Sequence, residues 1–140
     1  MASFNKINSF VEDLAEKVHN LGSDSLKVLL TNSAPVATNT IKANLTEITA
    51  ANGYTAGGIA PTISSSAQSS GTYKLVLADM VWTATGAVGP FRYPTLWNDT
   101  PTSPADPLIA WWDYGSSISL ANTETFTVDF DGTNGVLTIA

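Results

Sequence analysis

Few side chains in this chain have the chemistry of a catalytic or metal-binding group. His19 is the single histidine among 140 residues, and cysteine is absent. Catalysis by a nucleophile and a histidine base would have to use His19, and a zinc site would need a carboxylate-rich set that no local spacing suggests. Without cysteine there are no disulfides, thiolate ligands or thiol nucleophiles. His19 lies near the end of a predicted helix, where a cationic side chain favours the helix dipole. We therefore expect a structural role for His19, and no enzymatic activity, metal ion or cofactor.

The acidic residues offer two further kinds of chemistry. Asp99, Asp106 and Asp113 contain the pair that glycoside hydrolysis needs, but nothing in the sequence sets their separation, and acids beside Pro, Ser and Thr are usually solvated. Residues 129–134 (DFDGTN) are similar to the start of a calcium loop, but the bidentate glutamate that such a loop requires does not follow. A turn between strands is favoured there. The Gly-rich segment 52–58 (NGYTAGG) has no Lys-Ser/Thr sequel, so it is predicted to be a turn and not a phosphate cradle.

Aromatic residues among prolines are the better candidates for binding. Residues 86–107 hold five of the seven prolines and are predicted to form a long ordered loop, because proline cannot donate to a sheet ladder. The aromatic residue types are those enriched at protein interfaces, although they can also stack on sugar rings or fold inward over the core. Protein contact is favoured over sugar binding because few amide or carboxylate side chains neighbour the aromatics in sequence. The candidate interface residues are Phe91, Arg92, Tyr93, Leu96, Trp97 and Trp112, with Phe4, Ile7 and Val11 from the N-terminal helix.

The elements that position these residues follow from hydrophobic periodicity. Apolar residues recur at spacings of three and four within residues 1–22 and predict an amphipathic helix of about five turns, from an N-cap at Ser3 to Asn20 with Gly22 beyond its end. From residue 25 onward the pattern is that of strands.

The predicted strands and loops divide the rest of the chain. Residues 36–51 are expected to be mostly loop, and the polar run 64–71 an exposed loop. The predicted strands cover 26–31, 73–84 with an irregularity near Asp79, 108–114, and a terminal hairpin of 124–130 and 136–140. Trp111 and Trp112 should point to opposite faces of their strand. The predicted fold is mainly β, a small antiparallel β-sandwich over residues 25–140 with one N-terminal amphipathic α-helix, in a single domain of residues 1–140.

Composition narrows the class of partner. Hydrophobic residues make up 44% of the chain and charged residues only 13%, with a net charge of −6. A surface poor in charge suits contact with another protein, because few charges then need desolvating. No Lys/Arg cluster is present, so nucleic acid is not an expected partner. No apolar stretch is long enough to span a membrane and no secretion signal pattern begins the chain, so synthesis in the cytoplasm and no membrane partner are expected.

Several segments resemble small virion proteins encoded by tailed bacteriophages. They are residues 3–36 (SFNKINSFVEDLAEKVHNLGSDSLKVLLTNSAPV), 52–58 (NGYTAGG), 79–86 (DMVWTATG) and the late hairpin. The resemblance covers most of the chain through short motifs but does not include residues 89–107. It implies a head decoration (cement) protein that binds the major capsid protein on the capsid surface, as a homo-oligomer in which a trimer suits local threefold positions. The alternatives are a tail, fibre or baseplate component, or a carbohydrate-binding module on the virion surface.

Overall fold

The computed structural model describes residues 2–140. The predicted mainly β class is confirmed: strands account for 41% of the chain and helix for 6%, in several antiparallel sheets consistent with a β-sandwich. In chain order the elements are β1 (Asn5–Lys6), α1 (Phe10–Ala15), β2 (Leu26–Thr31), the 3-10 helix η1 (Lys42–Asn44), β3 (Ile63–Ser69), β4 (Thr72–Leu77), β5 (Met80–Thr83), β6 (Val88–Phe91), β7 (Tyr93–Asn98), β8 (Leu108–Trp111), β9 (Ile118–Leu120), β10 (Thr125–Val128) and β11 (Leu137–Ile139).

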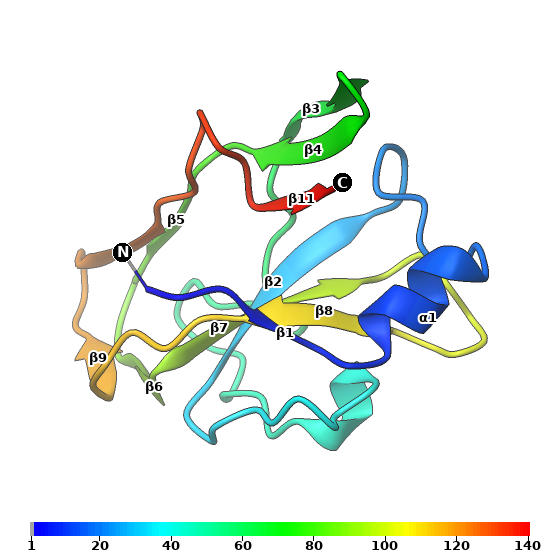
Figure 1. The fold of residues 1–140 in the computed structure, drawn as a ribbon. Helices are drawn as coiled ribbons and strands as arrows, with labels where there is room; N and C mark the ends of the chain where they lie inside the picture. Colours follow the sequence, from blue (N-terminus) through cyan, green and yellow to red (C-terminus); the bar gives the residue numbers. More distant parts are fainter. Residues whose placement is uncertain (1) are drawn as a thin grey trace.

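A four-stranded sheet of order β1-β8-β7-β2 lies at the centre of the fold (Figure 1). The strand predicted at residues 26–31 is confirmed as β2, and it pairs with β7 from Leu26 opposite Asn98 to Thr31 opposite Tyr93. Every β2 residue except Lys27 is buried. Both faces of this sheet are therefore covered, which explains why β2 is a continuous apolar run without alternation.

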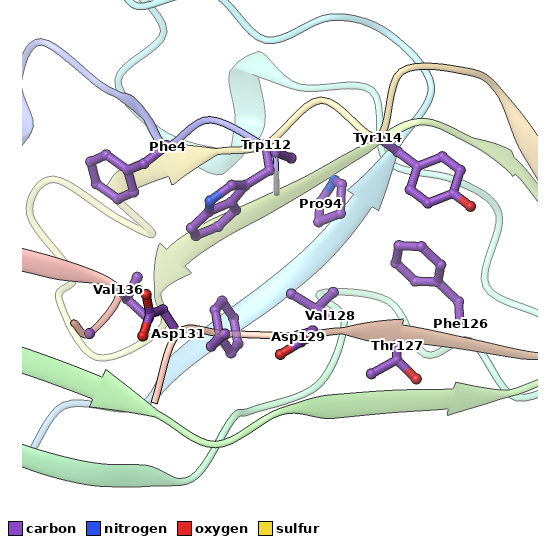
Figure 2. Close-up of a pocket in the computed structure, with 13 residues that line it drawn as sticks. Phe4, Pro94, Trp112, Tyr114, Phe126, Thr127, Val128, Asp129, Asp131 and Val136 are labelled. Atoms are coloured by element: carbon purple, nitrogen blue, oxygen red, sulfur yellow. The ribbon is translucent and has the colours of Figure 1, made fainter. Parts of the chain in front are cut away.

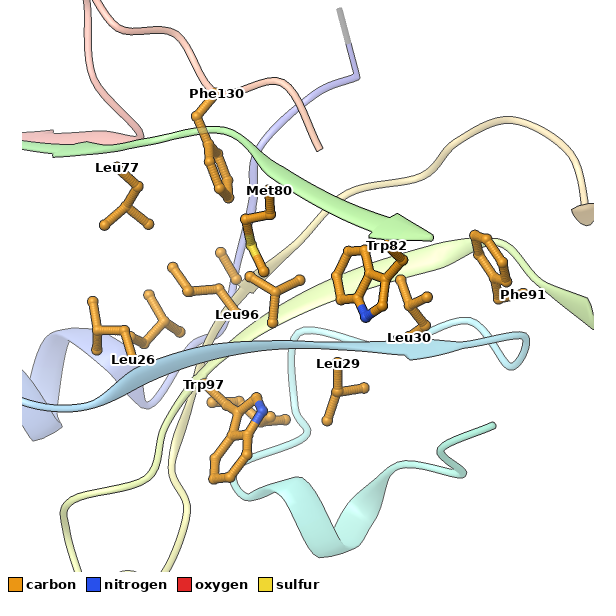
Figure 3. Packing of buried hydrophobic residues seen from close by; sticks show 14 of the residues in the cluster. Leu26, Leu29, Leu30, Leu77, Met80, Trp82, Phe91, Leu96, Trp97 and Phe130 are labelled. Atoms are coloured by element: carbon orange, nitrogen blue, oxygen red, sulfur yellow. The ribbon is translucent and has the colours of Figure 1, made fainter. Parts of the chain in front are cut away.

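The two covered faces carry different layers. Figure 3 shows Leu30 and Leu96 on the side of the sheet that faces β4 and β5, where Leu77 and Met80 pack. Trp97 lies on the opposite side with Leu29. That side is covered by the chain between β2 and β3, which is mostly loop, as predicted for residues 36–51.

Specific hydrogen bonds hold this covering loop against β2. The Tyr54 hydroxyl accepts the N–H of Leu30 at 3.0 Å and donates to the Glu47 carboxylate at 2.6 Å. Burial first, and then this bond to Glu47, raise the pKa of Tyr54 above its ordinary value. The indole N–H of Trp97 donates to the Gly57 carbonyl at 3.0 Å. The predicted turn at 52–58 is thus confirmed, and it is tied to both strands of the central pair.

The N-terminal helix is much shorter than predicted. The first element is β1, which pairs with β8. Ile7 continues this pairing beyond β1, because its N–H donates to the carbonyl of Ile109. The helix spans only Phe10 to Ala15. It ends there because Lys17 takes a left-handed φ of 65° and the N–H of Val18 donates to the carbonyl of Asp13, which closes the last turn. A lysine in the position usually held by glycine gives no stop signal in the sequence. No helix within residues 2–140 is long and apolar enough to cross a membrane.

The long loop predicted at residues 86–107 is also wrong, because the segment contains β6 and β7. Pro94 lies within β7 opposite Leu30. Leu30 uses its own N–H and C=O for Tyr54 and Ile48 on its other side. The Leu30–Pro94 pair therefore exchanges no backbone hydrogen bond, and the missing N–H of proline costs this pair nothing.

The remaining strands pair differently from the predicted terminal hairpin. Both segments, 124–130 and 136–140, contain strands, but β10 pairs with β5 and β11 with β4. The chain turns between them at Asp131, whose carboxylate accepts backbone N–H groups of its own loop. Asp79, at the predicted irregularity between β4 and β5, accepts the N–H of Phe130 at 2.9 Å. The interruption between β4 and β5 therefore lies against the segment between β10 and β11. On one side of it β10 pairs with β5, and on the other β11 pairs with β4.

The polar run 64–71 is a strand and turn, not a loop. Most of it belongs to β3, which pairs with β4 at the edge of the sheet β11-β4-β3. Ser70 and Gly71 turn the chain with φ of 50° and 83°. Most β3 side chains are exposed, so the strand lacks the apolar alternation by which a half-buried strand is recognised.

His19 packs the turn after α1 against the central sheet. It is 5% exposed, and its Nδ1 lies 3.1 Å from Nδ2 of Asn98 on β7. Because the amide Nδ2 donates, the imidazole accepts and is neutral. Burial lowers the pKa of His19 to about 4, against an opposing effect of Asp24. The helix ends before His19, so the predicted dipole interaction is replaced by this hydrogen bond.

The folded chain should therefore become less stable as the pH falls, because His19 is buried in its neutral form. Its pKa is about 4 in the folded chain, below the ordinary 6.5, so the unfolded chain binds more protons between these values. We expect the free energy of unfolding to drop by about 3 kcal/mol from pH 7 to pH 4 through this group. Urea titrations of wild type and His19→Gln across this range measure it: the variant should show a flatter profile. Parallel profiles would contradict a buried neutral imidazole.

Gly58 should be the least replaceable glycine of the covering loop. Its φ is +79°, and a Cβ there would lie 1.7 Å from the Val28 carbonyl oxygen. Gly71 provides the matched control, because its φ is +83° but a Cβ would meet nothing. We expect Gly58→Ala to lower the free energy of unfolding by about 4 kcal/mol or more, and Gly71→Ala by about 1 kcal/mol. Equal losses in urea denaturation would show that the loop does not lie this close to β2.

Candidate functional site

The structure buries part of the predicted interface in the core. The exposed fractions of Ile7, Phe91, Leu96 and Trp97 are 0%, 0%, 0% and 1%. In a folded subunit these side chains contact the protein's own interior and cannot anchor a partner. The prediction that they form a binding surface is therefore corrected. Strands β6 and β7 carry Phe91, Leu96 and Trp97 inward where a loop was expected to display them, and Ile7 follows β1 against β8 where a helix was expected.

The other predicted residues stay at the surface but do not form one patch. Val11 is 52% exposed on α1. Arg92 makes a two-pronged ion pair with Asp113, at 2.7 and 2.9 Å, and lies over the ring of Tyr93. The bond to Asp113 raises the pKa of Arg92, and the same bond lowers the pKa of Asp113.

Phe4 and Trp112, by contrast, meet in an open groove of about 540 Å³. Figure 2 shows the groove between two sets of side chains: Phe4, Pro94, Trp112 and Tyr114 on one side, and residues of β10 and the loop after it on the other. Trp112 directly follows β8, and its N–H donates to the Pro94 carbonyl at 3.0 Å. The pairing of β8 with β7 therefore sets the position of the Trp112 backbone.

The opposite wall depends on the pairing of β10 with β5. Phe126 stands opposite Trp82 in this pair, and Val128 stands opposite Met80. Trp82 and Met80 are core residues, so the same face of β10 turns towards the interior and closes the groove. Phe126, Phe130, Asp129 and Asp131 had not been predicted as site residues. Their sequence pattern, an alternating apolar strand followed by an Asp-Gly turn, is that of an ordinary hairpin, and its one binding signal, the likeness to a calcium loop, does not point to a groove.

The groove aromatics are fixed by edge-to-face contacts. The Trp112 ring packs against Phe4 at 5.8 Å and against Phe130 at 5.7 Å between centroids, with interplanar angles of 70° and 67°. Tyr114 packs on Phe126 at 5.7 Å and is 53% exposed. Such contacts orient the rings before any ligand arrives. Trp112 and Tyr114 lie on the two sides of Pro94 in Figure 2.

Carboxylates supply the polar part of the groove. Asp131 is occupied by its own loop: its backbone bonds, with Asn134 first, lower its pKa. This loop is a turn, as predicted, and within residues 2–140 no group of three or more His, Asp or Glu side chains is placed to hold a metal ion. Asp129 is exposed and makes no hydrogen bond or ion pair with the described residues. No described Lys, Arg or His lines the groove, but Lys74 lies close enough to Asp131 to contribute to the lowering of its pKa.

The acids considered for glycoside hydrolysis do not gather at any site. Asp99 pairs with Lys27 at 2.7 Å, Asp106 lies 4.0 Å from Lys42, and Asp113 binds Arg92. Each acid thus has a different basic partner. Aromatic rings held by edge-to-face contacts line the groove together with Asp129 and Asp131. No protein-family model, curated protein or solved structure matches the chain.

Proposed function

We propose that the protein is a structural component of a tailed-phage virion, a head decoration protein that binds and stabilises the major capsid shell. The short motifs of residues 3–36, 52–58 and 79–86 support this through their resemblance to small virion proteins. The observation that most supports binding to other subunits is the exposed edge strand β3. We also infer that the subunit is a small β-sandwich, in which the central sheet packs against β4, β5 and their partner strands.

The edge formed by β3 lacks the charged residues, the proline and the short length that usually protect an edge strand against pairing. Its seven residues, ISSSAQS, contain no charged residue and no proline, and most of their side chains are exposed. Soluble proteins usually guard long edge strands with lysine, proline or short length, because unpaired N–H and C=O groups accept another strand. A single register irregularity, between Ile63 and Ser65, interrupts the pairing with β4. An open edge of this length suits a protein whose edge is covered on assembly.

The low charge of the chain supports the same role. Only 13% of its residues are charged. A contact made by Ser, Thr and backbone groups desolvates few charges, so a large shared surface is favourable even when each contact is weak. A decoration protein binds many identical sites on a shell, which adds avidity to such contacts.

A trimer also fits the distribution of edges. Two identical β3 strands that pair with each other give a twofold dimer, whereas a closed threefold ring needs two different edges. The sheet β11-β4-β3 presents β3 at one edge and β11 at the other. We propose that β3 of one subunit meets a different edge of the next subunit or of the capsid protein.

The location of the protein in the particle tests the assignment. An electron-microscopy map of particles of the encoding phage should place copies on the outer surface of the head at local threefold positions. Copies found only in the tail or baseplate would refute the decoration role, and so would absence from purified particles.

Charges placed on β3 should weaken assembly. We expect Ser65→Lys with Gln68→Lys to reduce binding to purified undecorated shells by at least about tenfold, because lysines at an edge oppose strand pairing. Co-sedimentation across a concentration series measures the binding. Ser116→Lys with Asn122→Lys adds the same charge at exposed loop positions and should bind like wild type. Equal binding by both double variants would exclude β3 as the contact.

A further inference from the structure

The sheet β11-β4-β3 has a second open edge, which lies across β4 from β3 (Figure 1). Strand β11 pairs with β4 alone, and no backbone hydrogen bond joins residues 137–139 to any other described segment. Thr138 is exposed, and Ile139 keeps 37% of its surface exposed, an unusual fraction for a large apolar side chain of a strand. Like β3, β11 contains no charged residue and no proline. Both edges of this sheet are therefore open to another strand.

The two edges are complementary in direction. Strand β4 is antiparallel to both of its neighbours, so β3 and β11 run the same way. A second copy that continues the sheet by rotation about an axis along the strands brings its β11 beside β3 and parallel to it. Self-pairing of β3 is a twofold contact and leaves both β11 edges open. Head-to-tail pairing instead covers one β3 and one β11 at every contact.

The charges of the chain favour this sheet as the place where copies meet. The net charge is −6, so copies repel each other on average. Strands β3, β4 and β11 contain no acid, and Lys74 of β4 is their only charged residue. Lys74 stands opposite Ala67 on one side and Thr138 on the other, and it donates to the Thr133 carbonyl at 2.8 Å. Copies that meet through these strands bring none of the strands' own carboxylates together.

We propose that β3 of one copy pairs in parallel with β11 of a second copy of this chain. The pairing rests on the proposed function, since it assigns the partner of the edge that binds other subunits. Strand β11 has only three residues, so a single contact contains few hydrogen bonds and is weak. Copies held side by side on a shell are close together, and this proximity makes a weak contact effective.

Disulfide trapping tests the pairing, because the chain has no cysteine of its own. Ala67→Cys and Thr138→Cys place thiols at exposed positions of β3 and β11, on the face of the sheet that carries Lys74. Within one copy these two positions flank β4 at about 10 Å, too far apart for a disulfide. We expect an equimolar mixture of the two single variants, mildly oxidised at high concentration, to give at least about fivefold more mixed dimer than either same-variant dimer on non-reducing gels.

Two sets of variants complete the trapping experiment. Ser65→Cys and Ser69→Cys move the β3 thiol along the same face and cover the neighbouring registers. Ser116→Cys mixed with Asn122→Cys places thiols at exposed loop positions and measures chance collision. All of these side chains are small or exposed, so each variant should melt like wild type.

Trapping on the free chain and on decorated shells separates the strand contact from the decoration role. The β3–β11 contact is overturned if no β3 position gives more mixed dimer with Thr138→Cys than the loop pair gives, although the chain decorates shells. A product dominated by the Ala67→Cys homodimer also overturns it, since that dimer belongs to a twofold β3 contact. Capture of Thr138→Cys between chains that fail to bind shells would support the strand contact and refute decoration.

Discussion

The pairing of β2 with β7 is the interaction on which the other parts of the fold depend. Six consecutive residue pairs join two strands that are far apart in the chain. Both faces of this pair are buried, so a charged or bulky change on either strand disturbs one layer or the other. The layer of Leu30 and Leu96 supports β4 and β5, and the layer of Leu29 and Trp97 supports the covering loop.

The aromatic groove and the edge of β3 lie on different parts of this fold. The groove forms where the central sheet ends, because Trp112 and Tyr114 continue the line of β8 past its last residue. Their N–H groups still donate to Pro94 of β7 and to Arg92 just before it. One wall continues the central sheet, and the other is formed by β10, which pairs with β5, and by the loop after it. The edge of β3, by contrast, is bonded on one side only, through β4. An open edge suits a partner that adds its own strand.

Aromatic residues serve both the core and the surface in this chain, and sequence type does not separate the two uses. Trp97 and Phe91 are interior, whereas Trp112 and Tyr114 line the groove. The indole of Trp97 is bonded to Gly57 in the covering loop. Without that loop Trp97 would lie on an exposed sheet face, so its burial is a consequence of tertiary packing and not of its neighbours in sequence.

The sequence by itself determined the β class, the strand at 26–31, the break near Asp79 and the turn at 52–58, because each depends on apolar runs or glycines within a few residues. It overestimated the helix, since the stop at Lys17 uses a residue with no such preference. Only the tertiary structure decided that Pro94 lies in a strand, since its tolerance depends on which way Leu30 directs its N–H. The pairing of β10 and β11 and the meeting of Phe130 with Trp112 were decided in the same way. These features arise from contacts between segments distant in sequence, and local periodicity carries no record of such contacts.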